Sequence, residues 1–138
     1  MENAIMKLND EALNYTSMTL ASKRDKVTFY NAVQNPDSKL SDHINKKITF
    51  IHVAMSACEI QEKDDLGNPI PEAIHKTVKT VFVTPEGKGI ITTSMGVARA
   101  LMDMFNIFGT PDTWDEPMTC LVKQVDIGKN RTFKLEVC

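Results

Sequence analysis

Residues 92–109, TTSMGVARALMDMFNIFG, pass from a β-branched stretch directly into a helical pattern, and this stretch constrains the fold most. Ser94 is placed to cap the start of a helix. The apolar residues of the pattern fall on one helical face: Val97, Leu101, Phe105 and Phe108. This stripe predicts a helix that packs against a core. Gly109 ends the helix and Pro111 prevents it from restarting, so a single helix must follow a strand with almost no linker.

A long strand is predicted well before this helix. In residues 46–62, KKITFIHVAMSACEIQE, the apolar alternation changes phase between Phe50 and Ile51. A change of phase inside one strand indicates a β-bulge, where an extra residue bends the strand. Residues 63–73, KDDLGNPIPEA, are polar and contain Gly and Pro, and they predict a long loop.

Two further pairs of strands are predicted on either side of the helix. Residues 76–94 form a hairpin pattern around the PEGKG turn, whose glycines supply positive φ angles. Residues 118–128 and 131–138 read as two closing strands joined by a tight GKNR turn. The order is therefore long bent strand, strand, strand, helix, strand, strand.

This order predicts a mainly β fold in which one helix plugs a five-stranded Greek-key barrel, the OB-fold. A long bulged first strand fits such a barrel because it must curve to serve both halves. An α+β sheet with the same strands laid flat remains the alternative, since periodicity does not exclude it.

The N-terminal part is expected to add an arm and a short helix. Residues 1–21 predict a flexible arm, and residues 22–138 a single OB-like domain that begins with this short N-terminal helix. Ser22 and Asp25 form a capping-box pattern at the start of the helix, and the helix ends before Pro36. Its apolar face is expected to contain Val27, Tyr30 and Val33.

Several stretches resemble the small single-stranded DNA-binding proteins that tailed phages encode for genome replication. They are residues 39–55, KLSDHINKKITFIHVAM, residues 80–111, TVFVTPEGKGIITTSMGVARALMDMFNIFGTP, and the closing strands. The similarity covers roughly residues 25–138 and lies in the pattern of turns, caps and strands. The resemblance implies an OB-fold that coats transient single strands beside a replicative DNA polymerase or other replication proteins.

Motifs for catalysis or metal binding are missing from the sequence. The three histidines lack the spacing of zinc ligands, PEGKG lacks the full phosphate-loop pattern, and the three cysteines form no CxxC pair. We therefore expect a protein that is not an enzyme, with reduced thiols, no metal and no cofactor.

Charge and hydropathy bear on the partners and the compartment. The net charge is −2, but acidic residues gather in 1–15 and 59–72, which leaves a mildly basic body that permits a polyanion partner. No apolar run approaches the roughly 18 residues of a membrane span, and no signal-peptide layout is present. A cytoplasmic protein without a membrane partner is expected, in the host cytoplasm if the protein is phage-encoded.

A nonspecific single-strand site needs cations for phosphates and aromatic faces for bases. In an OB-fold such a site crosses the second and third strands and the two hairpin loops beside them. The predicted DNA-binding residues lie in these segments: Lys76, Lys79, Phe82, Lys88, Lys129, Arg131 and Lys134.

Two functions from different classes stay open at this point. The first is a single-stranded DNA-binding replication protein without strong sequence preference, and RNA binding would share its physics. The second is an OB-type interaction module that docks a replication or host protein through the acidic loop 59–72. The sequence does not decide the oligomeric state.

Overall fold

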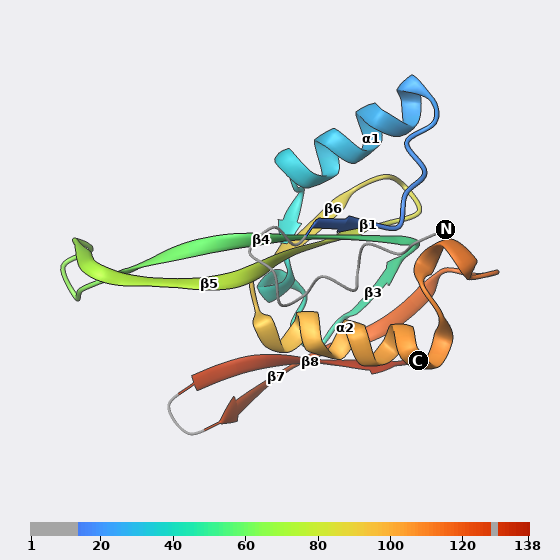
Figure 1. The fold of residues 1–138 in the computed structure, drawn as a ribbon. Helices are drawn as coiled ribbons and strands as arrows, with labels where there is room; N and C mark the ends of the chain where they lie inside the picture. Colours follow the sequence, from blue (N-terminus) through green and yellow to red (C-terminus); the bar gives the residue numbers. More distant parts are fainter. Residues whose placement is uncertain (1–13, 128–129) are drawn as a thin grey trace.

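Eight strands in two sheets dominate the computed structural model, which describes residues 14–127 and 130–138 (Figure 1). The larger sheet has five strands in the order β1 (Asn14–Thr16), β4 (His52–Lys63), β5 (Pro69–Val83), β6 (Gly89–Thr92) and β2 (Ser38–Lys39). The smaller sheet has the order β3 (Lys47–Phe50), β7 (Met118–Ile127) and β8 (Asn130–Val137). Neighbouring strands are antiparallel except for the β2–β6 pair, which is parallel.

The chain passes from one sheet to the other at Ile51, between β3 and β4. Ile48 and Phe50 are buried before this point, and Val53 and Met55 are buried after it. The buried phase therefore changes across Ile51, whose backbone N–H donates to the Val83 carbonyl at 2.8 Å. The predicted phase change is confirmed. Because of it, the continuous segment β3–β4 contributes one strand to each sheet.

Helix α2 (Met95–Phe108) follows β6 directly, as predicted. The Ser94 hydroxyl accepts from the Val97 N–H at 3.3 Å, and Gly109 ends the helix with a φ of 83°. The helix contacts β5 of the larger sheet and β8 of the smaller one. Phe108 was expected in the core, but 48% of its surface is exposed, because the last residue of the helix lies beyond the packed layers.

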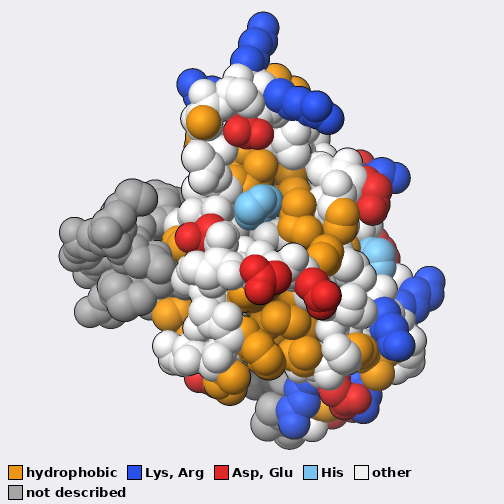
Figure 2. Space-filling view, turned by 90° about the vertical axis from the view of Figure 1, so that its right-hand side faces the viewer, with side chains coloured by type: hydrophobic (Ala, Val, Ile, Leu, Met, Phe, Trp, Pro, Cys, Tyr) orange, Lys and Arg blue, Asp and Glu red, His pale blue; other side chains and the backbone are white. Residues whose placement is uncertain are grey.

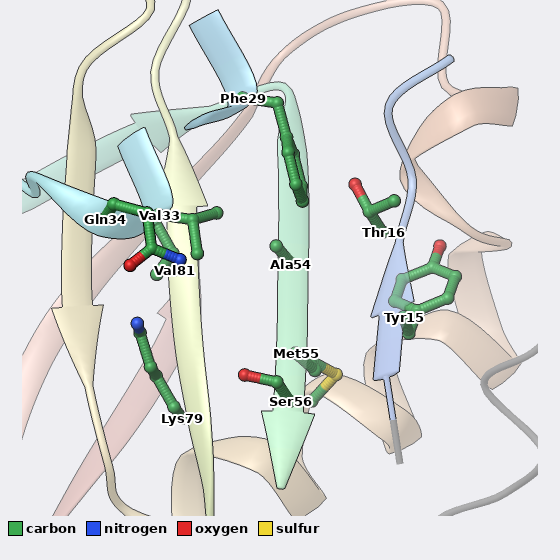
Figure 3. Close-up of a pocket in the computed structure, with 10 residues that line it drawn as sticks. All are labelled: Tyr15, Thr16, Phe29, Val33, Gln34, Ala54, Met55, Ser56, Lys79 and Val81. Carbon is green, nitrogen blue, oxygen red and sulfur yellow. The ribbon is translucent and has the colours of Figure 1, made fainter. Parts of the chain in front are cut away.

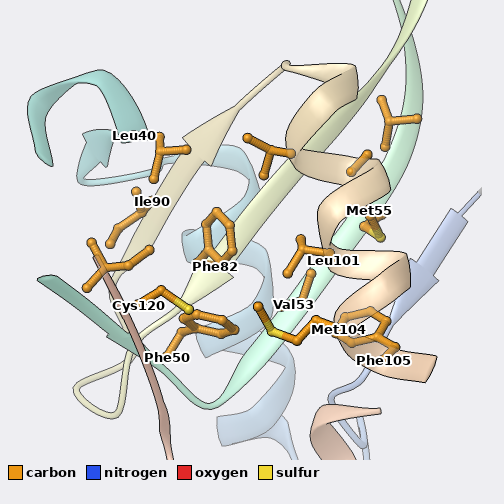
Figure 4. Packing of buried hydrophobic residues seen from close by; sticks show 14 of the residues in the cluster. Leu40, Phe50, Val53, Met55, Phe82, Ile90, Leu101, Met104, Phe105 and Cys120 are labelled. Carbon is orange, nitrogen blue, oxygen red and sulfur yellow. The ribbon is translucent and has the colours of Figure 1, made fainter. Parts of the chain in front are cut away.

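The main core lies between the two sheets and α2 (Figure 4). Its largest fully buried side chains include Phe50, Phe82 and Leu101. The rings of Phe50 and Phe82 meet edge to face with centroids 4.8 Å apart, a favourable geometry for aromatic pairs. Trp114 covers this core at the end of α2, and its indole N–H donates to the Gly109 carbonyl at 2.9 Å.

Helix α1 (Lys23–Gln34) packs on the other face of the larger sheet (Figure 1). The predicted capping box is present, since Ser22 and Asp25 exchange hydrogen bonds. The buried face of the helix centres on Ala32, whereas Val27 and Tyr30 are 48% and 62% exposed. The expected apolar face was therefore wrong at Val27 and Tyr30, whereas Val33 does pack against the sheet.

Two segments differ from the sequence-based interpretation. Residues 14–16 form β1 rather than an arm, and Tyr15 packs into the main core; residues 1–13 lie outside the described residues. Residues 63–73 form the end of a long β4–β5 hairpin arm rather than a loop. The Asp64 carboxylate organises its turn by accepting from the Leu66 and Asn68 N–H groups, each at 2.9 Å.

The mainly β expectation is confirmed, but a closed five-stranded barrel is not what the described residues form. The strands divide into sheets of five and three, with β2 at one edge of the larger sheet and β8 at one edge of the smaller one. Helix α1 also lies between β1 and β2 in the chain, so it does not precede the β structure.

Candidate nucleic-acid interface

The predicted cationic residues lie on separate surfaces. Lys79 of β5 is half-buried and faces α1, whereas Lys76 is exposed on the arm opposite Glu59. Lys88 is exposed in the turn before β6. Lys134 is exposed on β8, on the strand face opposite to that of its neighbours Phe133 and Leu135, which pack against the core. The structure therefore does not bring these four lysines into one cluster.

Phe82 cannot offer its ring to a base, which corrects its inclusion among the predicted binding residues. It is fully buried and packs against Phe50 in the main core. Lys129 and the side chain of Arg131 lie outside the part of the chain that the structure describes.

The first hollow of the interface lies between α1 and the larger sheet and has a volume of about 410 Å³ (Figure 3). Its floor comes from the outward face of β4 and β5, and Phe29, Val33 and Gln34 of α1 line it from above. Lys79 enters it from β5. Sequence reasoning placed Lys79 at the ligand but did not find the aromatic partner on α1.

A second hollow, of about 380 Å³, lies at the seam between β6 and β8. Lys39 of β2 and Phe133 of β8 line it together with the hydroxyl side chains of Ser41 and Thr93. Phe133 is half-buried there and also packs against the main core. An aromatic ring therefore lines each hollow, and so does a lysine.

The two hollows are lined by neighbouring residues of the sheet, although Leu40 and Phe133 of the second belong with the main core on the face away from α1. Val81 lines the first, Ile91 lines the second, and these residues are direct cross-strand partners on β5 and β6. The end of α1 covers this pair, because Val33 and Ile91 both pack against a small cluster that contains Val81. We call the two hollows together the β5–β6 face.

The surface beside the end of α2 is less suited to a polyanion. Asp112 and the neighbouring Asp115 and Glu116 are exposed beside the end of α2. Figure 2 shows acidic and hydrophobic side chains on this side, with Lys and Arg side chains over α1. Ile107 and Phe108 contribute to the apolar surface and are 76% and 48% exposed.

The β4–β5 arm is also acidic and carries exposed apolar side chains. Between residues 59 and 72 the acidic residues outnumber the single lysine and give a net charge of −4. Leu66 at the tip is 85% exposed, and Ile70 and Ile74 are 38% and 52% exposed. This combination suits a protein contact better than a phosphate contact.

Burial perturbs three titratable groups, and none of them forms a catalytic arrangement among the described residues. Burial lowers the pKa of His52, whose Nδ1 lies 3.0 Å from the Ser17 hydroxyl. Burial raises the pKa of the Cys120 thiol to about 12, with a smaller contribution from Cys138, and burial followed by Asp112 raises that of Tyr15 to about 12. In the described ranges no group of three acidic, histidine or cysteine side chains is arranged to hold a metal ion.

Comparisons with protein-family models, with curated proteins and with solved structures return no match for this chain. Among the helices of the described residues, none is both long enough and apolar enough to cross a membrane.

Proposed function

We propose that the protein binds single-stranded DNA without strong sequence preference and coats transient single strands during phage DNA replication. The β5–β6 face carries this proposal, because each of its hollows combines a lysine with an aromatic ring. Nonspecific single-strand binding needs these two elements, a cation for the backbone and a ring for the bases.

The arrangement of the elements supports an OB-type ligand face. The stretch β3–β4 serves both sheets, and β5, β6, α2, β7 and β8 follow in the order of that fold. In an OB-fold the ligand crosses the second and third strands between two hairpin loops. Here the corresponding strands are β5 and β6, and the β4–β5 and β7–β8 hairpins project from the same side of the molecule (Figure 1). The strands β1 and β2 and helix α1 are then additions to the OB core.

The resemblance of the sequence to phage single-strand binders supplies the biological setting of the proposal. The protein acts in the host cytoplasm beside a replicative DNA polymerase, and it holds DNA rather than transforming it. Nonspecific binding does not depend on side chains that read base edges, so single-stranded RNA can engage the same lysines and aromatic rings. RNA is therefore the competitor against which DNA binding must be tested.

Fluorescence titration of labelled oligo-dT tests the proposal, with duplex DNA and oligo-U as competitors. We expect oligo-dT to bind in preference to duplex, with an affinity that falls with log salt at about −0.7 per phosphate contact. Lys39→Ala removes one expected contact and should make the slope less steep by about 0.7. Lys47→Ala is the matched control, because Lys47 is an exposed lysine on β3 of the other sheet.

Two results would contradict the proposal. Absence of oligo-dT binding at low salt refutes single-strand binding altogether. Equal effects of Lys39→Ala and Lys47→Ala would refute the β5–β6 face as the place where the strand binds.

A protein-docking module is the second candidate function, and the arm favours it. Leu66, Ile70 and Ile74 are exposed on a hairpin whose charge opposes DNA. Replacing residues 60–74 with a tight two-residue turn distinguishes the two functions. If the protein binds single strands, the shortened protein should keep or slightly raise its affinity for oligo-dT. If it is a docking module, the parent protein should not bind oligo-dT, and the shortened protein should lose a protein complex that the parent forms.

A further inference from the structure

The hollow under α1 is built in two chemically different parts. Its volume of about 410 Å³ lies in the range of small-molecule sites. The apolar part is formed by Phe29, Val33, Ala54 and Val81 (Figure 3). It offers a ring and aliphatic walls but no charged group.

Three polar side chains form the other part of the hollow: Gln34, Ser56 and Lys79. Figure 3 shows Gln34 and Lys79 pointing toward each other across the space between α1 and β5. Along the strands, Ser56 and Lys79 lie nearer to the arm than Ala54 and Val81 do. The hollow is therefore apolar deeper in the body and polar toward the side where the arm projects.

Three polar side chains of this hollow have no partner among the described residues, whereas the Thr16 hydroxyl accepts from the Met18 N–H at 3.1 Å. Within residues 14–127 and 130–138, no hydrogen bond or ion pair engages the side chains of Gln34, Ser56 or Lys79. Lys79 is half-buried nonetheless, and its ammonium has no counter-charge among the described residues. An anionic group placed between these three donors would satisfy them together.

We infer that this hollow binds one nucleotide unit of the strand, with the base in the apolar part and the phosphate in the polar part. The base packs against the ring of Phe29, while Lys79, the Gln34 amide and the Ser56 hydroxyl donate to phosphate oxygens. The inference rests on the proposed function and deepens it, because it assigns a first nucleotide position on the β5–β6 face.

The chemistry of the hollow also predicts how it discriminates. Thr16 is the hydroxyl side chain beside the apolar part, and a single hydroxyl can donate or accept, so all bases should be accepted. The donors contact the phosphate, so a nucleotide should bind and its nucleoside should not.

Binding of thymidine monophosphate, followed by NMR shifts of backbone amides, tests the inference directly. We expect shifts at Ala54 and Val81 with thymidine monophosphate and none with thymidine at the same concentration. If oligo-dT displaces the mononucleotide at a lower nucleotide concentration, the physiological ligand is a strand. If oligo-dT displaces the mononucleotide no better than free nucleotide does at the same nucleotide concentration, the ligand of this hollow is a free nucleotide.

Two substitutions test the two parts of the hollow in oligo-dT titrations. Phe29→Leu keeps an apolar side chain but removes the aromatic face, and it should weaken binding roughly tenfold. Its control is Tyr30→Leu, because Tyr30 is the next residue of α1 and is 62% exposed. Lys79→Met keeps the aliphatic stem and should make the salt slope less steep by about 0.7, with Lys47→Ala again as control.

The outcomes separate the inference from the function on which it rests. If the parent protein binds no oligo-dT at low salt, both fail. If the parent binds and both variants bind like the parent while melting at its temperature, the nucleotide position is refuted and single-strand binding stands. If Phe29→Leu melts early, Lys79→Met and the thymidine comparison still decide the result.

Discussion

Gly89→Ala should detach α1 from the sheet, because the helix backbone lies directly against this glycine. A Cβ atom built at Gly89 would overlap the carbonyl oxygen of Ala32 in α1. The backbone of Gly89 has no positive φ, so the conformation itself would accept alanine and the effect should be steric. The neighbouring atom is backbone and cannot rotate away as a side chain would.

The size of the effect follows from the contacts around Gly89 that a shift of α1 and of the segment after it would disturb. Gly89 exchanges two hydrogen bonds with Asp37, one from the Asp37 N–H to the Gly89 carbonyl at 2.9 Å and one from the Gly89 N–H to the Asp37 carboxylate at 3.0 Å. A typical hydrogen bond contributes about 1 kcal/mol, and overpacking a close contact costs about 1–3 kcal/mol. We expect the free energy of unfolding to fall by about 1–3 kcal/mol.

Urea denaturation of Gly89→Ala beside Gly96→Ala measures this effect. A Cβ at Gly96 would meet the hydroxyl of Thr132, which can rotate, and alanine is favoured over glycine inside a helix by about 1 kcal/mol. Gly96→Ala should therefore be close to neutral. Equal stability of Gly89→Ala and the parent protein would refute the reasoning, because the helix would then have room to shift without loss.

Other consequences follow from buried polar groups. Thr80 is fully buried and its hydroxyl has no hydrogen-bond partner in the described residues, so Thr80→Val should raise the free energy of unfolding in urea by about 1 kcal/mol; a loss of stability would contradict this. Burial lowers the pKa of His52 below its ordinary 6.5, so the unfolded chain takes up the proton first as the pH falls. The stability of the folded protein should therefore decline below about pH 6.5. Melting followed by circular dichroism should show a smaller decline in His52→Gln. Burial holds the pKa of Cys120 at about 12 while Cys138 is exposed, so a thiol reagent at pH 8 should modify Cys138 well before Cys120, and equal rates in the native state would show that the core is open.

The local features of the fold could be predicted from the sequence because their causes lie within a few residues. Ser22 and Ser94 cap the helices that were predicted to begin after them. The change of phase at Ile51 marked the bend between the two sheets. Of the two glycines in the predicted hairpin turn, Gly87 supplies a positive φ of 84° and Gly89 does not. Caps, turns and alternation each follow from the geometry of neighbouring residues, so one chain segment carries the whole signal.

The candidate site could be predicted only in part. Lys79 was identified, but Phe29, Gln34, Lys39 and Phe133 were not, since they come from α1, β2 and β8 and meet the face only in the folded chain.

The orientation of β5 shows why tertiary structure had to decide the rest. Apolar residues occupy both of its phases, so alternation could not tell which side faces the core. Phe82 points into the main core, while Val81 and Val83 point toward α1. The second apolar face exists because a helix covers it, and the sequence of a strand does not record which distant helix will pack there.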